Sequence, residues 1–138
     1  MAPKQPPRDA PAGSEKLTLN LGPVDLGRID LLVREGFYTN RSDFIRQAIR
    51  ARLDGHGPEL REAGARLEVE TGIRRYGRAE LEARRDAGRP LHVRVLGLAA
   101  IDSDVSPELA RAAIGSLTVL GTLQASAEVR RALADRLR

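Results

Sequence analysis

The amino-acid sequence predicts an α+β fold, on the strength of three observations. Residues 16–21 alternate strictly between polar and apolar side chains, which is the period of a half-buried strand. Two segments with helical periodicity and helix-capping residues follow before residue 56. In the second half, a strand-like segment that leads into a helix start occurs twice. We therefore expect a strand–helix–helix unit at the N-terminus and a small α/β region of repeated strand–helix units at the C-terminus.

The composition excludes several classes of protein. The chain has 138 residues, 41% of them hydrophobic, which allows one domain or two very small ones. It contains no cysteine, so disulfides, thiolate metal sites and cysteine nucleophiles are excluded. The two histidines, His56 and His92, form no ligand spacing. Because no nucleophile–base pair, catalytic carboxylate pair or cofactor-binding loop is present either, we expect no enzymatic activity, no cofactor and no metal.

The charge balance is mildly basic. Twenty-three lysines and arginines stand against nineteen acidic residues, a net charge of +4, which is compatible with nucleic-acid binding but does not establish it. The longest apolar run, residues 96–101, is too short to span a bilayer, and no apolar stretch of a signal peptide follows the N-terminus. The expected compartment is the cytoplasm.

The chain divides into four predicted segments. Residues 1–15 contain four prolines and no leucine, isoleucine, valine or aromatic residue, which predicts a disordered, proline-rich arm with basic residues. Residues 16–55 hold the strand–helix–helix unit. Residues 56–90 are a polar, helix-prone connecting region in which 69–76 is either a short strand or a loop. Residues 91–138 contain the strand–helix repeat.

The N-terminal unit carries start and stop signals for two helices. Pro23 suits the first position of the first helix, and Gly36 suits its left-handed C-terminal cap. Asn40 is placed to cap the second helix, with Asp43 reaching back to it from the third helical position. The second helix ends at Gly55. Each helix has one apolar face, as expected for packing against a common core.

A lone strand in so small a unit lacks a pairing partner and a sufficient core. A second copy supplies both if the two 16–21 strands pair antiparallel across a two-fold axis. The apolar side chains of the strand and of both helices then form a dimer core, comprising Leu17, Leu19, Leu21, Ile29, Leu32, Phe44, Ile45 and Ile49. The polar side chains Lys16, Thr18 and Asn20 face outward on the resulting ribbon.

The string KLTLNLG at the strand and the string GFYTNRSDFIRQAIR at residues 36–50 resemble the ribbon-helix-helix DNA-binding family, the MetJ, Arc and CopG class, over residues 16–54. The resemblance implies an intertwined homodimer whose antiparallel ribbon enters the DNA major groove, where its outward side chains read bases. It also implies that amides at the start of the second helix hold a phosphate. Carried over to this chain, the base-reading residues are Lys16, Thr18 and Asn20, and the phosphate-binding residues are Asn40, Arg41 and Ser42.

The chemistry of these side chains fits those roles. Asparagine pairs with adenine, lysine donates to guanine, and threonine bonds to bases or packs on a thymine methyl group. The amides and positive partial charge of a helix N-terminus bind anions. Taken alone, an outward Lys-Thr-Asn set is typical of any solvent-exposed strand, but the two capped helices that follow favour DNA binding. For Arg46 and Arg50 we favour a solvent-exposed helix face paired with Asp43.

The C-terminal region repeats itself. Residues 93–98 match residues 117–122, and each segment leads to a helix start with serine at the cap, Ser106 and Ser126. A weaker third copy runs from residue 72 to residue 87. The glycine shared by the repeats indicates a kink or close packing, and Leu120 is expected in the core of the last strand. This region resembles no named family.

Three functions fit the sequence. The first is a sequence-specific transcriptional regulator, most simply a repressor, that binds double-stranded DNA in the nucleoid. The second is the antitoxin of a toxin–antitoxin pair, and the third is a plasmid-partition protein that binds a centromere-like site. The long, patterned C-terminal region favours the regulator, because an antitoxin tail is expected to be disordered or a single helix. We expect residues 58–138 to bind a protein partner, or the exposed ends of the repeat to join dimers into tetramers or longer assemblies.

Overall fold

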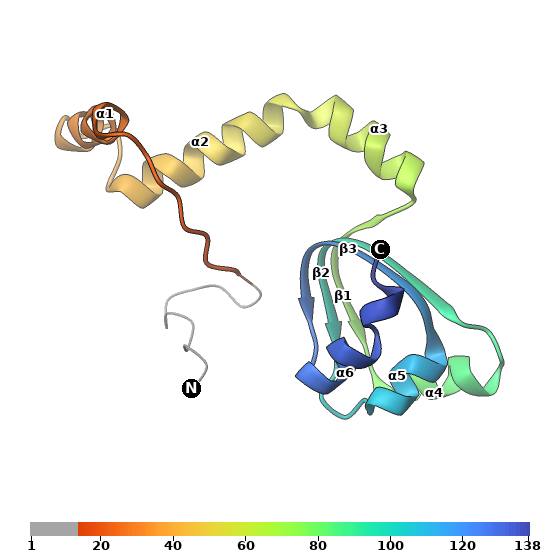
Figure 1. The fold of residues 1–138 in the computed structure, drawn as a ribbon. Helices are drawn as coiled ribbons and strands as arrows, with labels where there is room; N and C mark the ends of the chain where they lie inside the picture. Colours follow the sequence, from red (N-terminus) through yellow and green to blue (C-terminus); the bar gives the residue numbers. More distant parts are fainter. Residues whose placement is uncertain (1–13) are drawn as a thin grey trace. The chain divides into compact units, whose positions relative to one another are not determined.

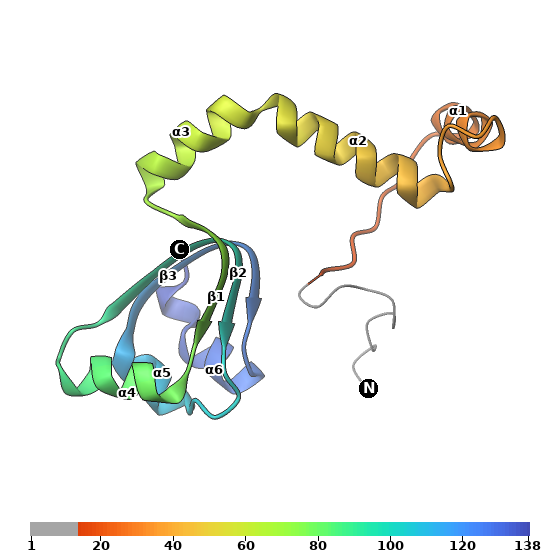
Figure 2. The ribbon, with the colours of Figure 1, turned by 180° about the vertical axis from the view of Figure 1, so that it is seen from behind.

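The computed structural model describes residues 14–138, which form two compact units, residues 16–63 and residues 64–138 (Figures 1 and 2). The predicted disordered arm, residues 1–15, lies outside the described residues except for its last two positions.

The N-terminal unit is built from helices α1 (Pro23–Arg34) and α2 (Arg41–Gly55). Pro23 occupies the start of α1, and Gly36, with a φ of +88°, ends the turn that follows it, as predicted. The third helix, α3 (Gly57–Leu67), begins after a single intervening residue, His56. The predicted glycine stop at the end of α2 is therefore confirmed, and the predicted helix in the connecting region is present.

Residues 14–22, which precede α1, adopt neither helix nor strand in the single chain. The expected strand over 16–21 is thus not formed here, because a strand requires a hydrogen-bonding partner and the other described strands all lie in the C-terminal unit. The antiparallel ribbon and the dimer remain predictions.

The C-terminal unit alternates strands and helices around one sheet. Its strands are β1 (Glu70–Tyr76), β2 (Leu91–Ile101) and β3 (Ile114–Gln124), which are parallel and lie in the order β1-β2-β3. Helices α4 (Arg78–Asp86), α5 (Pro107–Ala113) and α6 (Ala127–Ala132) follow the strands in turn, and a 3-10 turn, η1 (Ala134–Arg136), follows α6. Both predicted repeat strands and both serine caps are confirmed, and the ambiguous segment 69–76 contains β1.

One face of the sheet is covered and the other is open. Alternate strand residues, among them Val93, Val95 and Leu117, are buried in one core with residues of α4, α5 and α6 (Figures 1 and 2). On the opposite face Ile73 is 70% exposed and Leu120 is 47% exposed. The expectation that Leu120 lies in the core was wrong, because its position in the β-strand alternation places it on the face without helices.

A row of glycines crosses the sheet. Gly72, Gly97 and Gly121 are register partners on β1, β2 and β3, with φ values of +129°, +137° and +123°. A Cβ atom at Gly97 would overlap the carbonyl oxygen of Gly72, and one at Gly121 would overlap that of Gly97. Of the two interpretations of the repeated glycine, a kink or close packing, the structure confirms close packing.

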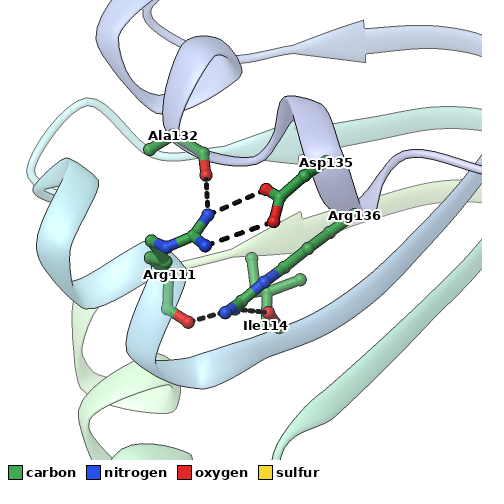
Figure 3. A network of polar contacts seen from close by, with 5 residues as sticks. All are labelled: Arg111, Ile114, Ala132, Asp135 and Arg136. Carbon is green, nitrogen blue, oxygen red and sulfur yellow. Dashed lines mark hydrogen bonds and ion pairs between the residues drawn. The ribbon is translucent and has the colours of Figure 1, made fainter.

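A polar network fixes the C-terminal end of the chain against the sheet (Figure 3). Arg111 donates to both carboxylate oxygens of Asp135, at 2.8 and 3.2 Å, and to the carbonyl oxygen of Ala132 at 2.7 Å. Arg136 donates to the carbonyl oxygens of Ile114 and Arg111. The hydrogen bond from Arg111 lowers the pKa of Asp135, so the pair stays ionised at neutral pH and is lost only as the pH falls through the carboxyl range.

Candidate functional site

An open apolar groove lies between the two helices of the N-terminal unit and the segment before α1. Its volume is about 530 Å³. The lining residues are Leu19, Leu21, Asp25, Arg28, Ile29, Leu32, Phe44, Ile45, Ala48, Ile49 and Arg52. Seven of the eight predicted dimer-core residues are among them, and Leu17 is the exception. In the single chain Leu17 is 85% exposed and Leu19 is 63% exposed, so much of this apolar surface faces water.

The three predicted base-reading residues lie on the exposed segment before α1. Lys16, Thr18 and Asn20 are all solvent-exposed. Leu19 and Leu21 line the groove, whereas Asn20 between them does not. Leu19 and Leu21 lie toward the groove as the alternation predicts, whereas Leu17 is exposed like the polar residues beside it.

The start of α2 carries the predicted cap, with one difference. Asn40 has extended backbone angles, and its Oδ1 accepts from the amide of Asp43 at 2.8 Å. Asp43 was expected to reach back to Asn40, but its Oδ2 accepts from the amide of Thr39 at 3.0 Å, because the turn brings that earlier amide into range. Hydrogen bonds from Thr39 and Gln47 lower the pKa of Asp43. The carboxylate of Asp43 therefore stabilises the turn before α2.

An aromatic contact braces the same turn. Tyr38 and Phe44 meet edge to face, with ring centroids 4.9 Å apart. Arg46 and Arg50 are exposed, as expected, but neither forms an ion pair with Asp43, whose hydrogen-bond partners are Thr39 and Gln47. The charge of Arg46 still contributes to lowering the pKa of Asp43.

Two amides at the start of α2 remain available. Within residues 14–138, the N–H groups of Arg41 and Ser42 donate to no protein acceptor, whereas those of Asp43 and Phe44 are bonded to Asn40. The side chain of Ser42 is exposed as well. Free amides and the positive end of a 15-residue helix can bind an anion.

The side chain of Arg41 is bound by Asp30 of α1, which the sequence analysis missed. Its Nε and Nη2 donate to the two carboxylate oxygens at 2.7 and 2.8 Å, and the side chains are 56% and 50% exposed. The hydrogen bond from Arg41 lowers the pKa of Asp30, and the same bond raises the pKa of Arg41. The two residues are eleven positions apart on different helices, so no local spacing indicates the pair. A phosphate at this site competes with Asp30 for the guanidinium.

The described structure, residues 14–138, has no candidate metal centre. It contains no group of three or more histidine, aspartate or glutamate side chains that could hold a metal ion. On the open face of the sheet, His92 Nδ1 and Ser116 Oγ lie 2.8 Å apart, and both residues have solvent access. Over the same described range, no helix is both long and apolar enough to cross a membrane.

Comparison with known proteins identifies one family. The family model of the ribbon-helix-helix transcriptional regulators matches residues 12–130. The match extends well beyond residues 16–54 and includes most of the C-terminal sheet unit. No curated protein and no solved structure matches the chain.

Proposed function

Because the chain belongs to the ribbon-helix-helix transcriptional regulator family, we propose that it binds specific DNA sites as a homodimer and acts as a repressor in the cytoplasm, on the nucleoid. The observation that carries this proposal is the open apolar groove of the N-terminal unit. Apolar side chains left in water cost free energy that burial against a second copy recovers.

The dimer follows from the same groove. Two 16–21 segments that pair antiparallel place Leu19 and Leu21 of both copies over the four helices. The polar side chains Lys16, Thr18 and Asn20 then lie on the outer surface of the ribbon, at the width that a DNA major groove admits. In this arrangement the exposed Leu17 also becomes covered.

Substituting Leu19 by aspartate is expected to prevent dimerisation, because it places an unpaired charge among apolar side chains. At protein concentrations too low for C-terminal units to associate, sedimentation velocity should show a monomer, and far-UV circular dichroism should show a loss of helix. Thr18→Asp is the matched control. It adds the same charge on the outward face, so it should remain a dimer while it fails to bind DNA. A Leu19→Asp variant that is still a dimer at this low concentration would contradict the groove as the dimer interface.

The phosphate contact is proposed at the start of α2. The free amides of Arg41 and Ser42 donate to a phosphate oxygen there, and Asn40 holds the turn as the cap. The guanidinium of Arg41 can also contact this phosphate, but only if it leaves Asp30 or is shared between Asp30 and the phosphate. Asp30 therefore weakens the contact of Arg41 with any DNA, whatever its sequence.

Arg41→Ala is expected to weaken binding to all DNA sequences alike. It should also lower the slope of log binding constant against log salt concentration by the contribution of about one phosphate contact. Asp30→Asn is expected to have the opposite effect, because it releases the guanidinium. Fluorescence anisotropy at several salt concentrations measures both. The matched control is Arg50→Ala, an equal loss of charge on an exposed position of the same helix. A loss confined to one operator would instead make Arg41 a base reader.

The C-terminal unit favours the regulator over the antitoxin. Residues 64–138 form a compact unit with a core of its own, including Leu81, Val95, Leu117 and Val129. An antitoxin tail that folds only on its toxin has no such core. Association of dimers into tetramers or longer assemblies is the role that we propose for this unit.

A further inference from the structure

We propose that the free edge of β1 in one copy pairs with the free edge of β3 in another, so that the parallel sheet continues head to tail between copies. This contact lies outside the ribbon and its groove. The contact needs only the C-terminal unit. The statement that it joins DNA-bound dimers rests on the proposed function.

The outer edge of β3 lacks the usual protection against pairing, whereas β1 carries the charged residues Glu70, Arg74 and Arg75. The sheet order leaves one side of β1 and one side of β3 without a neighbouring strand. The β3 sequence, IGSLTVLGTLQ, contains neither a charged residue nor a proline. Proteins that keep an edge strand unpaired place such residues on it, so an uncharged edge of eleven residues indicates a pairing partner.

The glycine row makes the two edges complementary. Each strand directs the carbonyl of its glycine toward the next strand, where only another glycine leaves space for it, as at Gly97 and Gly121. Gly72 has the same left-handed conformation, yet nothing lies within 4 Å of the position that its Cβ would take. Gly121 is the last glycine of the row. The carbonyl of Gly121 in one copy therefore suits the vacant side of Gly72 in the next.

The C-terminal residues limit this pairing to one part of β3. Leu137 forms a parallel bridge with Leu117, and the amide of Arg138 donates to the carbonyl of Leu117 at 2.8 Å. If Gly72 of one copy lies opposite Gly121 of the next, Glu70 lies opposite Val119. Val119 is two positions beyond Leu117. The incoming β1 therefore begins beyond Leu117, the residue that the C-terminal segment bridges.

The occupant is a second copy because β1 meets the demands of this edge. It carries a glycine at the required register and has no proline. Its charged residues Glu70, Arg74 and Arg75 fall opposite the uncharged side chains of β3. A contact between two different edges does not close on itself in a two-fold dimer, so it links one dimer to the next.

Engineered cysteines test the pairing directly, since the chain has none of its own. Ile73 and Thr122 belong to one row of the sheet, separated by Leu98 of β2. Within a copy they are two strand spacings apart, about 9.6 Å, beyond the roughly 7 Å that a disulfide spans between Cα atoms. Between paired copies they are neighbours at about 4.8 Å.

Under mild oxidation, full-length protein with Ile73→Cys and Thr122→Cys is expected to form a ladder of covalent oligomers on a denaturing gel. Each single variant should form none. The absence of a ladder from the double variant would overturn the proposal. Equal cross-linking by Ile73→Cys alone would also overturn it, because it would indicate stacking of open sheet faces.

Two glycine variants provide a second test by light scattering. Gly72→Ala and Gly88→Ala both introduce a Cβ at a positive φ, +129° and +63°, with nothing within 4 Å. Only Gly72 lies on the β1 edge. We expect wild-type protein and Gly88→Ala to exceed the dimer mass as concentration rises, and Gly72→Ala to remain a dimer. Equal masses for the two variants would overturn the pairing.

A further comparison separates this proposal from DNA reading. His92→Ala changes the open sheet face on the central strand β2 and leaves both edge strands unchanged, so it should keep the ladder in the cysteine background. Thr18→Ala with Asn20→Ala should also keep the ladder while it loses operator preference. Failure of the ladder alone therefore refutes the edge pairing, and failure of the operator test alone refutes the ribbon.

Discussion

The double variant Thr18→Ala, Asn20→Ala is expected to lose most of its preference for its operator over other DNA. Each good base contact contributes about 1–3 kcal/mol of discrimination, so two lost contacts reduce the preference by about 30-fold or more. Non-specific affinity should largely survive, because phosphate contacts supply it. The operator can be obtained by selecting random duplexes with the wild-type protein, and anisotropy competition then measures the ratio.

The matched control for this variant lies on the other unit. Ser116→Ala with Thr118→Ala removes two hydroxyl groups from the open sheet face, remote in sequence from the ribbon segment. It should keep the wild-type preference. A double variant at Thr18 and Asn20 that still discriminates as the wild type does would show that bases are read elsewhere.

Gly97→Ala is expected to unfold the C-terminal unit or to destabilise it by about 3 kcal/mol or more. The new methyl group overlaps the carbonyl of Gly72, and the φ of +137° is strained for any residue with a Cβ. Because β2 is the central strand, both strand pairings depend on this position. Urea unfolding followed by circular dichroism measures the loss.

Gly88→Ala is the control for backbone strain alone. Its φ is also positive, but its Cβ meets nothing, and it lies outside the sheet. It should cost about 1 kcal/mol, near the lower end of the strain expected at such positions. DNA binding by the N-terminal unit should persist in both variants at low concentration. A Gly97→Ala protein as stable as Gly88→Ala would contradict the close approach of the strands.

Local signals in the sequence predicted most of the elements. The caps at Asn40, Ser106 and Ser126, and the positive φ at Gly36, follow from the chemistry of one or two residues. The two repeat strands followed from internal similarity. For the caps and the positive φ, the determining residues lie within a few positions of one another.

Features that depend on tertiary geometry were not predicted. The Asp30–Arg41 pair joins two helices across a turn, and the partner of Asp43 is an amide one residue earlier than expected. Leu120 is apolar, yet it faces outward because all three helices cover the other side of the sheet. Hydrophobicity alone does not say which face of a strand the helices cover.

The direction of the C-terminal bridge has a practical consequence for purification. Leu137 pairs with Leu117 in parallel, so a peptide appended after Arg138 would run on beside β3 toward Val119. An affinity tag fused there would occupy the same edge, and protein carrying it should assemble less than protein from which a protease has removed the tag. Comparing the two preparations requires no substitution in the chain itself.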